Sequence, residues 1–360
     1  MTLKEENDAL RKKLEKYEHL LEEVLDGPFE EGIIASELVN GMFRLESGEI
    51  KMVNPKDDRL QTVKIGSHVL CNKSMIIEVL NDKLHQKPKP VEFNPITWEQ
   101  IGGLKSQIQS IRDSIELPVK QAALFKKYGL SSSKGIVLYG PPGCGKTMVA
   151  KAIASEFLKG QSINKDSFMY LKGGEMLNPY VGVAENNIKS LFDRARANYK
   201  KTHTKSVIFI DEAEAILPAR GSRRSSDVES TIVPTFLSEM DGFEENTTLI
   251  ILATNFISQL DPAVIRPGRI DLHIAINRPT KDDMQDIFSI YIKGKLVNGD
   301  VKELCHVAAT ALDTKDEYFK SGAQVKSIIE KASLCAIKRE IAGDKAGIDI
   351  HDVLTIINNL

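Results

Sequence analysis

Apolar residues recur with different periods along the chain, and the changes of period divide it into segments. In residues 2–26 they alternate at spacings of four and three with charged residues between them, which is the pattern of a coiled-coil seam. The apolar stripe is narrower than that of an amphipathic helix packed on its own domain, the alternative interpretation. We therefore expect a coiled coil over residues 1–27 that pairs between chains. The seam positions are Leu3, Asn7, Leu10, Leu14, Tyr17, Leu21 and Val24.

Residues 28–86 carry short runs of apolar and β-branched residues, separated by turn signals such as Asn40-Gly41 and Ser47-Gly48. Several short strands in so short a span predict a small closed β-barrel of the OB type. The segment has few aromatic residues and no basic stripe, so a spacer or ring-forming collar is favoured over a surface for single-stranded nucleic acid. The proline-rich sequence that follows predicts a stiff linker over residues 87–96.

Strand-like and helix-like segments alternate from Trp98 onward, which is typical of an α/β domain with a parallel sheet. After Pro279 the strands cease, and apolar residues follow only the helical period. We expect an α/β subdomain over residues 97–279 and a helical subdomain over residues 280–360. The predicted strands cover residues 136–139, 168–171, 207–210, 249–253 and 272–276, and two of the predicted helices cover residues 184–196 and 230–240.

The most informative stretch follows the first strand of the α/β segment. It has the phosphate-binding pattern G-x-x-x-x-G-K-T between an apolar strand and a helix. Glycines let the backbone N–H groups point into one concavity, where phosphate oxygens bind. Lys146 is expected to neutralise the β- and γ-phosphates, and the hydroxyl of Thr147 to bind Mg²⁺. The sequence therefore predicts a site for a nucleoside triphosphate with Mg²⁺. Its residues are Gly140, Pro141, Pro142, Gly143, Cys144, Gly145, Lys146, Thr147 and Met148.

Polar residues that suit phosphoryl transfer follow two later strands. Asp211 and Glu212 come directly after a buried strand, and the carboxyl ends of parallel strands are where ligands gather. Asp211 is expected to bind Mg²⁺, and Glu212 to act as the base that activates the attacking water. Asn255, after the next strand, would help to hold that water. Arg266 and Arg269 would stabilise developing phosphate charge, reaching the nucleotide of a neighbouring subunit if the protein forms a ring.

The composition argues against several kinds of partner and site. The chain has 48 basic and 50 acidic residues, so no strong overall charge favours nucleic acid or an anionic membrane. Its four cysteines form no CxxC pair, which argues against a zinc site and a disulfide framework. No apolar stretch approaches the ~20 residues of a membrane span. We therefore expect a cytoplasmic protein without a membrane partner.

Taken in order, these motifs resemble those of AAA-family ATPases over residues 97–340. The segment that begins at Thr97 is similar to the one whose backbone lies near adenine in that family. A Gly-Ala pair later in the chain is similar to the sensor-2 region, which approaches the nucleotide. The resemblance implies ATP as the nucleotide, a homohexameric ring and a helical lid after the sheet. It adds Ile101, Gly102, Gly322 and Ala323 to the expected nucleotide site.

The order of coiled coil, barrel and AAA module is similar to that of proteasome-associated ATPases, both archaeal and actinobacterial. This resemblance implies that protein substrates are unfolded by threading through a pore. It places Tyr180 and Val181 in the first pore loop, and the alternative is that Tyr180 packs in the core. Actinobacterial members have two tandem barrels and a C-terminal hydrophobic-Tyr-X tail that docks on the proteasome. This chain has room for one barrel and ends in Ile-Ile-Asn-Asn-Leu. A proteasome-like protease is therefore implied less strongly as a partner than protein substrates are.

Two other functions compete with this interpretation. An ATP-dependent assembly or scaffold module would not need Glu212, Asn255 and two arginines in these places. A nucleic-acid motor is disfavoured by the balanced charge and by the aromatic residue of the expected pore loop.

Overall fold

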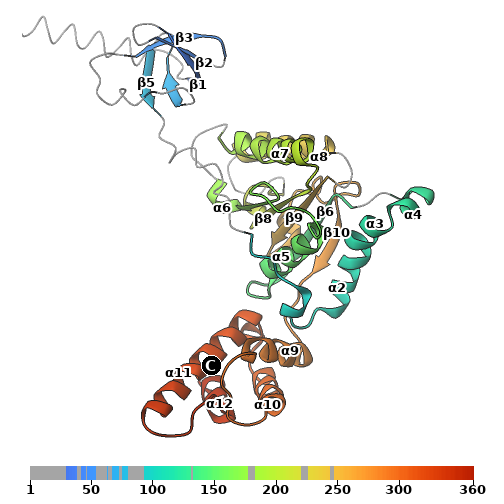
Figure 1. Ribbon diagram of the computed structural model, residues 1–360, viewed down its shortest axis with the longest axis vertical. Coiled ribbons are helices and arrows are strands. Elements are labelled where there is room, and N and C mark those ends of the chain that lie inside the picture. The colour runs from blue at the N-terminus through green and yellow to red at the C-terminus, as the bar shows by residue number, and fades with distance from the viewer. Residues whose placement is uncertain are drawn as a thin grey trace, which may run out of the picture. The chain divides into compact units, whose positions relative to one another are not determined.

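The structure of the chain is a computed structural model (Figure 1). It describes residues 30–38, 42–45, 47–53, 63, 67–72, 75–79, 93–130, 133–176, 183–219, 226–243 and 247–360. The predicted coiled coil, most of the predicted linker, Tyr180 and Val181 lie outside these residues. Contacts divide the chain into two units, Met1–Lys87 and Pro88–Leu360. The described part of the chain contains no helix with the length and apolar content that a bilayer crossing demands.

The first unit contains a closed β-barrel. Its strands are β1 (Glu30–Glu37), β2 (Met42–Leu45), β3 (Ile50–Val53), β4 (His68–Cys71) and β5 (Met75–Val79). They pair in the order β1-β2-β3-β5-β4, and β4 closes the barrel on β1. Alternate side chains point inward, as Phe43 and Leu45 do on β2, because successive residues of a strand face opposite sides. The structure is consistent with the predicted small OB-like barrel.

The second unit begins with an α/β sheet whose strands are all parallel. They are β6 (Gly135–Tyr139), β7 (Phe168–Lys172), β8 (Ser206–Asp211), β9 (Thr248–Thr254) and β10 (Ile270–Ala275). Their order is β10-β6-β9-β8-β7. Each predicted strand is present, with bounds within two residues of the expected ones. The predicted parallel sheet is confirmed.

Helices cover both faces of this sheet, as Figure 1 shows. Because side chains alternate along a strand, Val137 packs on one face with α7 and α8, and Leu138 packs on the other with α5 and α2. The helices of this part are α2 (Lys105–Ile111), α3 (Leu117–Lys120), α4 (Ala122–Lys127), α5 (Lys146–Phe157), α6 (Gly173–Met176), α7 (Val183–Thr202) and α8 (Ser226–Asp241). Short helical turns are η2 (Trp98–Gln100), η3 (Arg112–Glu116), η4 (Ala213–Ala215) and η5 (Ile257–Gln259).

The rest of the unit is helical, and we call it the lid. Its elements are α9 (Lys281–Ile292), α10 (Val301–Asp313), η6 (Glu317–Phe319), α11 (Gly322–Ile341) and α12 (Ile350–Asn358). Apolar residues of all four α-helices share one core, to which Met284, Leu304, Ile328 and Val353 belong. The turn before α9 is a capping box: the Thr280 hydroxyl accepts from the backbone N–H of Asp283, whose carboxylate accepts from the N–H of Thr280.

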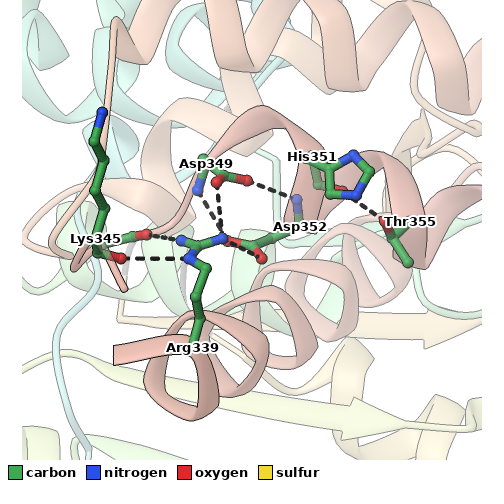
Figure 2. Close-up of polar contacts among 7 residues, drawn as sticks. Arg339, Lys345, Asp349, His351, Asp352 and Thr355 are labelled. Carbon is green, nitrogen blue, oxygen red and sulfur yellow. Dashed lines mark hydrogen bonds and ion pairs between the residues drawn. The ribbon is translucent and has the colours of Figure 1, made fainter. Parts of the chain in front are cut away.

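One arginine joins the last two helices of the lid (Figure 2). Nη1 of Arg339, near the end of α11, donates to Asp349 Oδ2 at 2.7 Å and to Asp352 Oδ1 at 2.8 Å. Its other nitrogens donate to the carbonyl oxygens of Gly347 and Lys345, in the turn between the helices. The side chain of Asp352 is 8% exposed, so this ion pair is partly shielded from water. The guanidinium therefore fixes both the turn and the first turn of α12.

Candidate nucleotide-binding site

The loop between β6 and α5 has a backbone that suits glycine. Gly140, Gly143 and Gly145 have φ angles of 142°, 76° and 95°. A Cβ atom at Gly140 would also collide with the carbonyl oxygen of Ile276. Helix α5 starts directly after the loop, and the free N–H groups and dipole of its N-terminus favour an anion there. The loop is therefore shaped to hold phosphate.

Lys146, the first residue of α5, is held at this loop. Its Nζ donates to the carbonyl oxygens of Gly140 at 2.7 Å and Pro141 at 3.0 Å, and to Asn255 Oδ1 at 2.9 Å. All three acceptors are neutral. Burial lowers the pKa of Lys146, and the charges of groups such as Asp211 act in the opposite direction. A buried ammonium group with neutral partners is complementary to a phosphate, and this supports the fit of the predicted nucleotide.

The start of α5 and the end of β8 place two oxygen atoms that can bind a metal ion close together. Thr147 Oγ1 donates to Asp211 Oδ2 at 3.0 Å. A hydroxyl and a carboxylate are ligand types that Mg²⁺ accepts, usually with water and phosphate oxygens completing the shell. The pair therefore fits the predicted role in Mg²⁺ binding.

Glu212 follows Asp211 in a strained conformation. Its φ of 53° lies in the left-handed region, as do those of two other described non-glycine residues, Leu104 and His203. Glu212 and Leu104 both line the cavity described below, and such strain is frequent at functional sites. The Glu212 carboxylate lies 3.4 Å from Nζ of Lys172, at the end of β7. In this arrangement the predicted base is paired with a cation.

These residues surround one cavity of about 480 Å³ between the α/β sheet and the lid. The lid closes it through close contacts: the backbone N–H of Ala323 donates to Gly143 O at 3.2 Å, and a Cβ atom at Gly102 would lie 2.7 Å from the backbone of Ile287. Gly140 and Pro141 do not line the cavity themselves, but their carbonyl oxygens accept hydrogen bonds from Lys146, which does. The predicted residues that line it are Ile101, Gly102, Pro142, Gly143, Cys144, Gly145, Lys146, Thr147, Met148, Asp211, Glu212, Asn255, Gly322 and Ala323.

Several cavity residues were not predicted from the sequence. Ile287 and Tyr291 of α9 line it, as does Leu104. The spacing of Ile287 and Tyr291 predicts a helix but does not say which of its residues meet a ligand. Lys172 was also missed, because its contact with Glu212 depends on the pairing of two strands that are distant in sequence.

The two predicted arginines lie elsewhere. Arg269 donates from Nε and Nη2 to the two carboxylate oxygens of Asp241, at 3.0 Å and 2.8 Å, and from Nη1 to the carbonyl oxygen of Ala263. This hydrogen bonding lowers the pKa of Asp241 and raises that of Arg269. Arg266 is exposed. Neither arginine lines the nucleotide cavity of its own chain.

Comparison with known proteins agrees with this geometry. Residues 136–278 match the family "ATPase family associated with various cellular activities (AAA)". The chain is 39% identical over 287 residues to an "AAA ATPase forming ring-shaped complexes" of Corynebacterium diphtheriae, covering 74% of this chain and 56% of the relative. It is 35% identical over 363 aligned residues to a "Proteasome-associated ATPase" of Streptosporangium roseum, covering 86% of this chain and 62% of the relative. A protein of the same name from Kineococcus radiotolerans is 38% identical over 304 residues, covering 73% and 52%.

The chain thus spans between 52% and 62% of the length of these three relatives. The matched segment contains strands β7 to β10 and all of β6 but its first residue, together with the phosphate-binding loop, Asp211, Glu212 and Asn255. Residues 136–278 therefore form a domain of the AAA family, and the chain is similar to proteins named proteasome-associated ATPase.

Proposed function

We propose that this protein hydrolyses ATP in a homohexameric ring in the cytoplasm and uses the energy to unfold or remodel other proteins. The observation that carries the proposal is the convergence of Lys146, Thr147, Asp211, Glu212 and Asn255 on one cavity. These residue types supply the charge, the metal ligands and the base that phosphoryl transfer to water requires.

Each residue of the site has its own role in the proposed hydrolysis. Lys146 exchanges its neutral acceptors for phosphate oxygens. Thr147 and Asp211 hold Mg²⁺, which supplies positive charge against the phosphates. Glu212 leaves Lys172 and accepts a proton from the attacking water at a carboxylate oxygen, while Asn255 orients that water. The strained backbone of Glu212 aids this role, because it holds the side chain at the carboxyl edge of the sheet.

A ring completes the site in this proposal. Arg266 is exposed and Arg269 points to Asp241, so either can act on a nucleotide only if that nucleotide belongs to a neighbouring subunit. The name of one relative describes ring-shaped complexes, which supports the same arrangement. Six copies would place six sets of arginines between subunits.

Protein substrates are the proposed cargo. Tyr180 and Val181 lie between α6 and α7 in the sequence and are proposed to grip an extended chain in the pore. The relatives' names suggest a proteasome-like protease as a further partner.

The decisive experiment replaces the proposed base. Glu212→Gln keeps the shape of the side chain and should leave ATP binding intact while hydrolysis falls by about 10²- to 10⁴-fold. Glu156→Gln is the matched control, because Glu156 pairs with Lys159 and does not line the nucleotide cavity. Retention of half the turnover by Glu212→Gln would refute the assignment.

A second experiment separates unfolding from hydrolysis. Tyr180→Ala should keep ATP hydrolysis but lose the unfolding of a tagged, stably folded substrate, whereas Tyr180→Phe should keep both. Unfolding at the wild-type rate by Tyr180→Ala would show that this tyrosine is not the grip.

A further inference from the structure

The nucleotide cavity has a basic side chain on each of its two walls. Lys146 belongs to the α/β wall, where the carbonyl oxygens of the phosphate-binding loop hold its ammonium group. The other is Lys326 of α11, and among the described residues it is the one basic side chain with which the lid lines the cavity. The roles proposed above use Lys146 and leave Lys326 without a function.

The start of α11 brings Lys326 close to the phosphate-binding loop. The backbone N–H of Ala323 donates to the carbonyl oxygen of Gly143 at 3.2 Å. Lys326 follows Ala323 by three residues, so the two lie on one face of the helix, about 4.5 Å apart along its axis. Side chains of a helix lean toward its N-terminus. The side chain of Lys326 can therefore extend over Ala323 toward the loop around Gly143.

The lid offers an anion in the cavity no other side chain of positive charge among the described lining residues. Gly322 and Ala323 have uncharged side chains. Asp283 of α9 is acidic, and its carboxylate already accepts hydrogen bonds from the N–H and hydroxyl groups of Thr280. A phosphate group that faces the lid can therefore obtain a cationic partner there only from Lys326.

The present partner of Lys326 holds it weakly. Nζ of Lys326 lies 3.8 Å from Oε1 of Glu330, its one ionic partner among the described residues, and the two side chains are 56% and 61% exposed. Ion pairs with this exposure contribute little to stability, and a lysine one turn before its glutamate is in the less favourable order. Lys326 can therefore leave Glu330 at little cost.

We propose that Lys326 exchanges Glu330 for a phosphate oxygen when nucleotide binds, and so selects phosphorylated nucleotides over nucleosides. Lys146 and Lys326 then hold the phosphates from opposite walls of the cavity. The inference rests on the proposed ATP site and adds a specificity-determining residue to it. It also makes the attachment of the lid to the nucleotide depend on the phosphate groups, since adenosine would leave Lys326 with Glu330.

Calorimetric titration of the whole protein with ADP and with adenosine tests the contact. Lys326→Met removes the charge and keeps most of the length of the side chain. Its dissociation constant for ADP should rise about threefold to tenfold, while that for adenosine stays unchanged. Lys331→Met is the matched control, because Lys331 is an exposed residue of α11 that does not line the cavity, and it should change neither constant. Lys326→Arg restores the charge and should restore the affinity for ADP.

A change at Glu330 tests the exchange of partners. Glu330→Gln removes the competing carboxylate and should tighten the binding of ADP by up to about fivefold, the worth of an exposed ion pair. In the Lys326→Met background the same change should have almost no effect, because both act on one interaction. A purely structural role of Lys326 would not produce this dependence. Circular dichroism establishes that each variant is folded.

The possible results separate this inference from the proposed function. If the folded Lys326→Met protein binds ADP as the wild type does, or loses ADP and adenosine to the same extent, Lys326 does not contact phosphate, although the nucleotide site stands. An effect of Glu330→Gln that persists in the Lys326→Met background would overturn the exchange of partners. Failure of the wild type to bind either ligand would instead refute the proposed ATP site, and the role of Lys326 with it.

Discussion

The contact between Lys172 and Glu212 predicts an unusual outcome, a substitution at the site that speeds hydrolysis. Nζ of Lys172 lies 3.4 Å from a carboxylate oxygen of Glu212, and the two side chains are 43% and 46% exposed. To act as a base, Glu212 must leave this cation and face the attacking water. Lys172→Met removes the competing partner and keeps most of the length of the side chain.

The size of the effect follows from the exposure of the pair. Ion pairs exposed to this extent contribute about 0.2–1 kcal/mol, because water screens them and both side chains lose freedom. If that free energy must be spent before each hydrolysis step, its removal raises the turnover number by about 1.4-fold to fivefold. A larger increase would need a pair that is more deeply buried than this one.

Steady-state release of phosphate at saturating ATP measures the effect. Lys159→Met is the control, because it removes a lysine paired with Glu156 at 3.0 Å, away from the nucleotide cavity, and should leave the rate unchanged. In the Glu212→Gln background Lys172→Met should have almost no effect, since the two changes act on one interaction. An unchanged or lower turnover number in the Lys172→Met single variant would refute the reasoning, and a lower one would assign Lys172 a direct part in hydrolysis.

Three other predictions concern the lid, a buried thiol and the ring. Arg339→Met should lower the stability of the lid by about 2–3 kcal/mol, because it leaves the shielded carboxylate of Asp352 without its cation. Lys338→Met, a neighbouring exposed change, should cost less than about 1 kcal/mol, and urea unfolding followed by circular dichroism measures both. Burial raises the pKa of Cys305 to about 11, so the folded state keeps a proton that the unfolded state loses. The free energy of unfolding should therefore fall as the pH rises from 9.0 toward 11. An equally steep fall of this free energy with pH in Cys305→Ala would contradict the prediction. Mixed rings of Arg266→Ala and Lys146→Ala subunits should recover part of the ATPase activity that each variant lacks alone, and mixed rings that form but stay inactive would argue against catalysis between subunits.

The parts of the site that the sequence predicts are those fixed by local structure. The loop from Gly140 to Thr147 can be recognised because its glycines and its flanking strand and helix are contiguous. Asp211 and Glu212 can be recognised because they end a buried strand. The order of strands in the sheet cannot be read in this way, and it is what brings Asn255 within 2.9 Å of Lys146.

Contacts between distant segments account for what was missed. Lys172 reaches Glu212 because β7 pairs with β8, with Lys172 opposite Asp211. Arg269 was predicted as a donor to phosphate, but its pairing with Asp241, 28 residues earlier, depends on where α8 ends. The contact of the segment before α2 with α9 likewise depends on tertiary packing: a Cβ atom at Gly102 would lie 2.7 Å from the backbone nitrogen of Ile287. Periodicity identifies such helices without identifying their neighbours.

The register between β6 and β9 has a consequence for how this chain tolerates lost residues. Residues 135–139 lie opposite residues 250–254, so Asn255 emerges beside the start of the phosphate-binding loop. Both faces of β9 are buried and apolar, with Ile250 and Leu252 on one face and Leu249 and Ile251 on the other. A deletion of one residue within β9 would exchange the faces while still presenting apolar side chains to both, but it would shift Asn255 by about 3.3 Å along the strand. Such a deletion variant should keep the sheet but lose the contact between Asn255 and Lys146. The fold therefore tolerates a change of length in this strand better than the nucleotide site does.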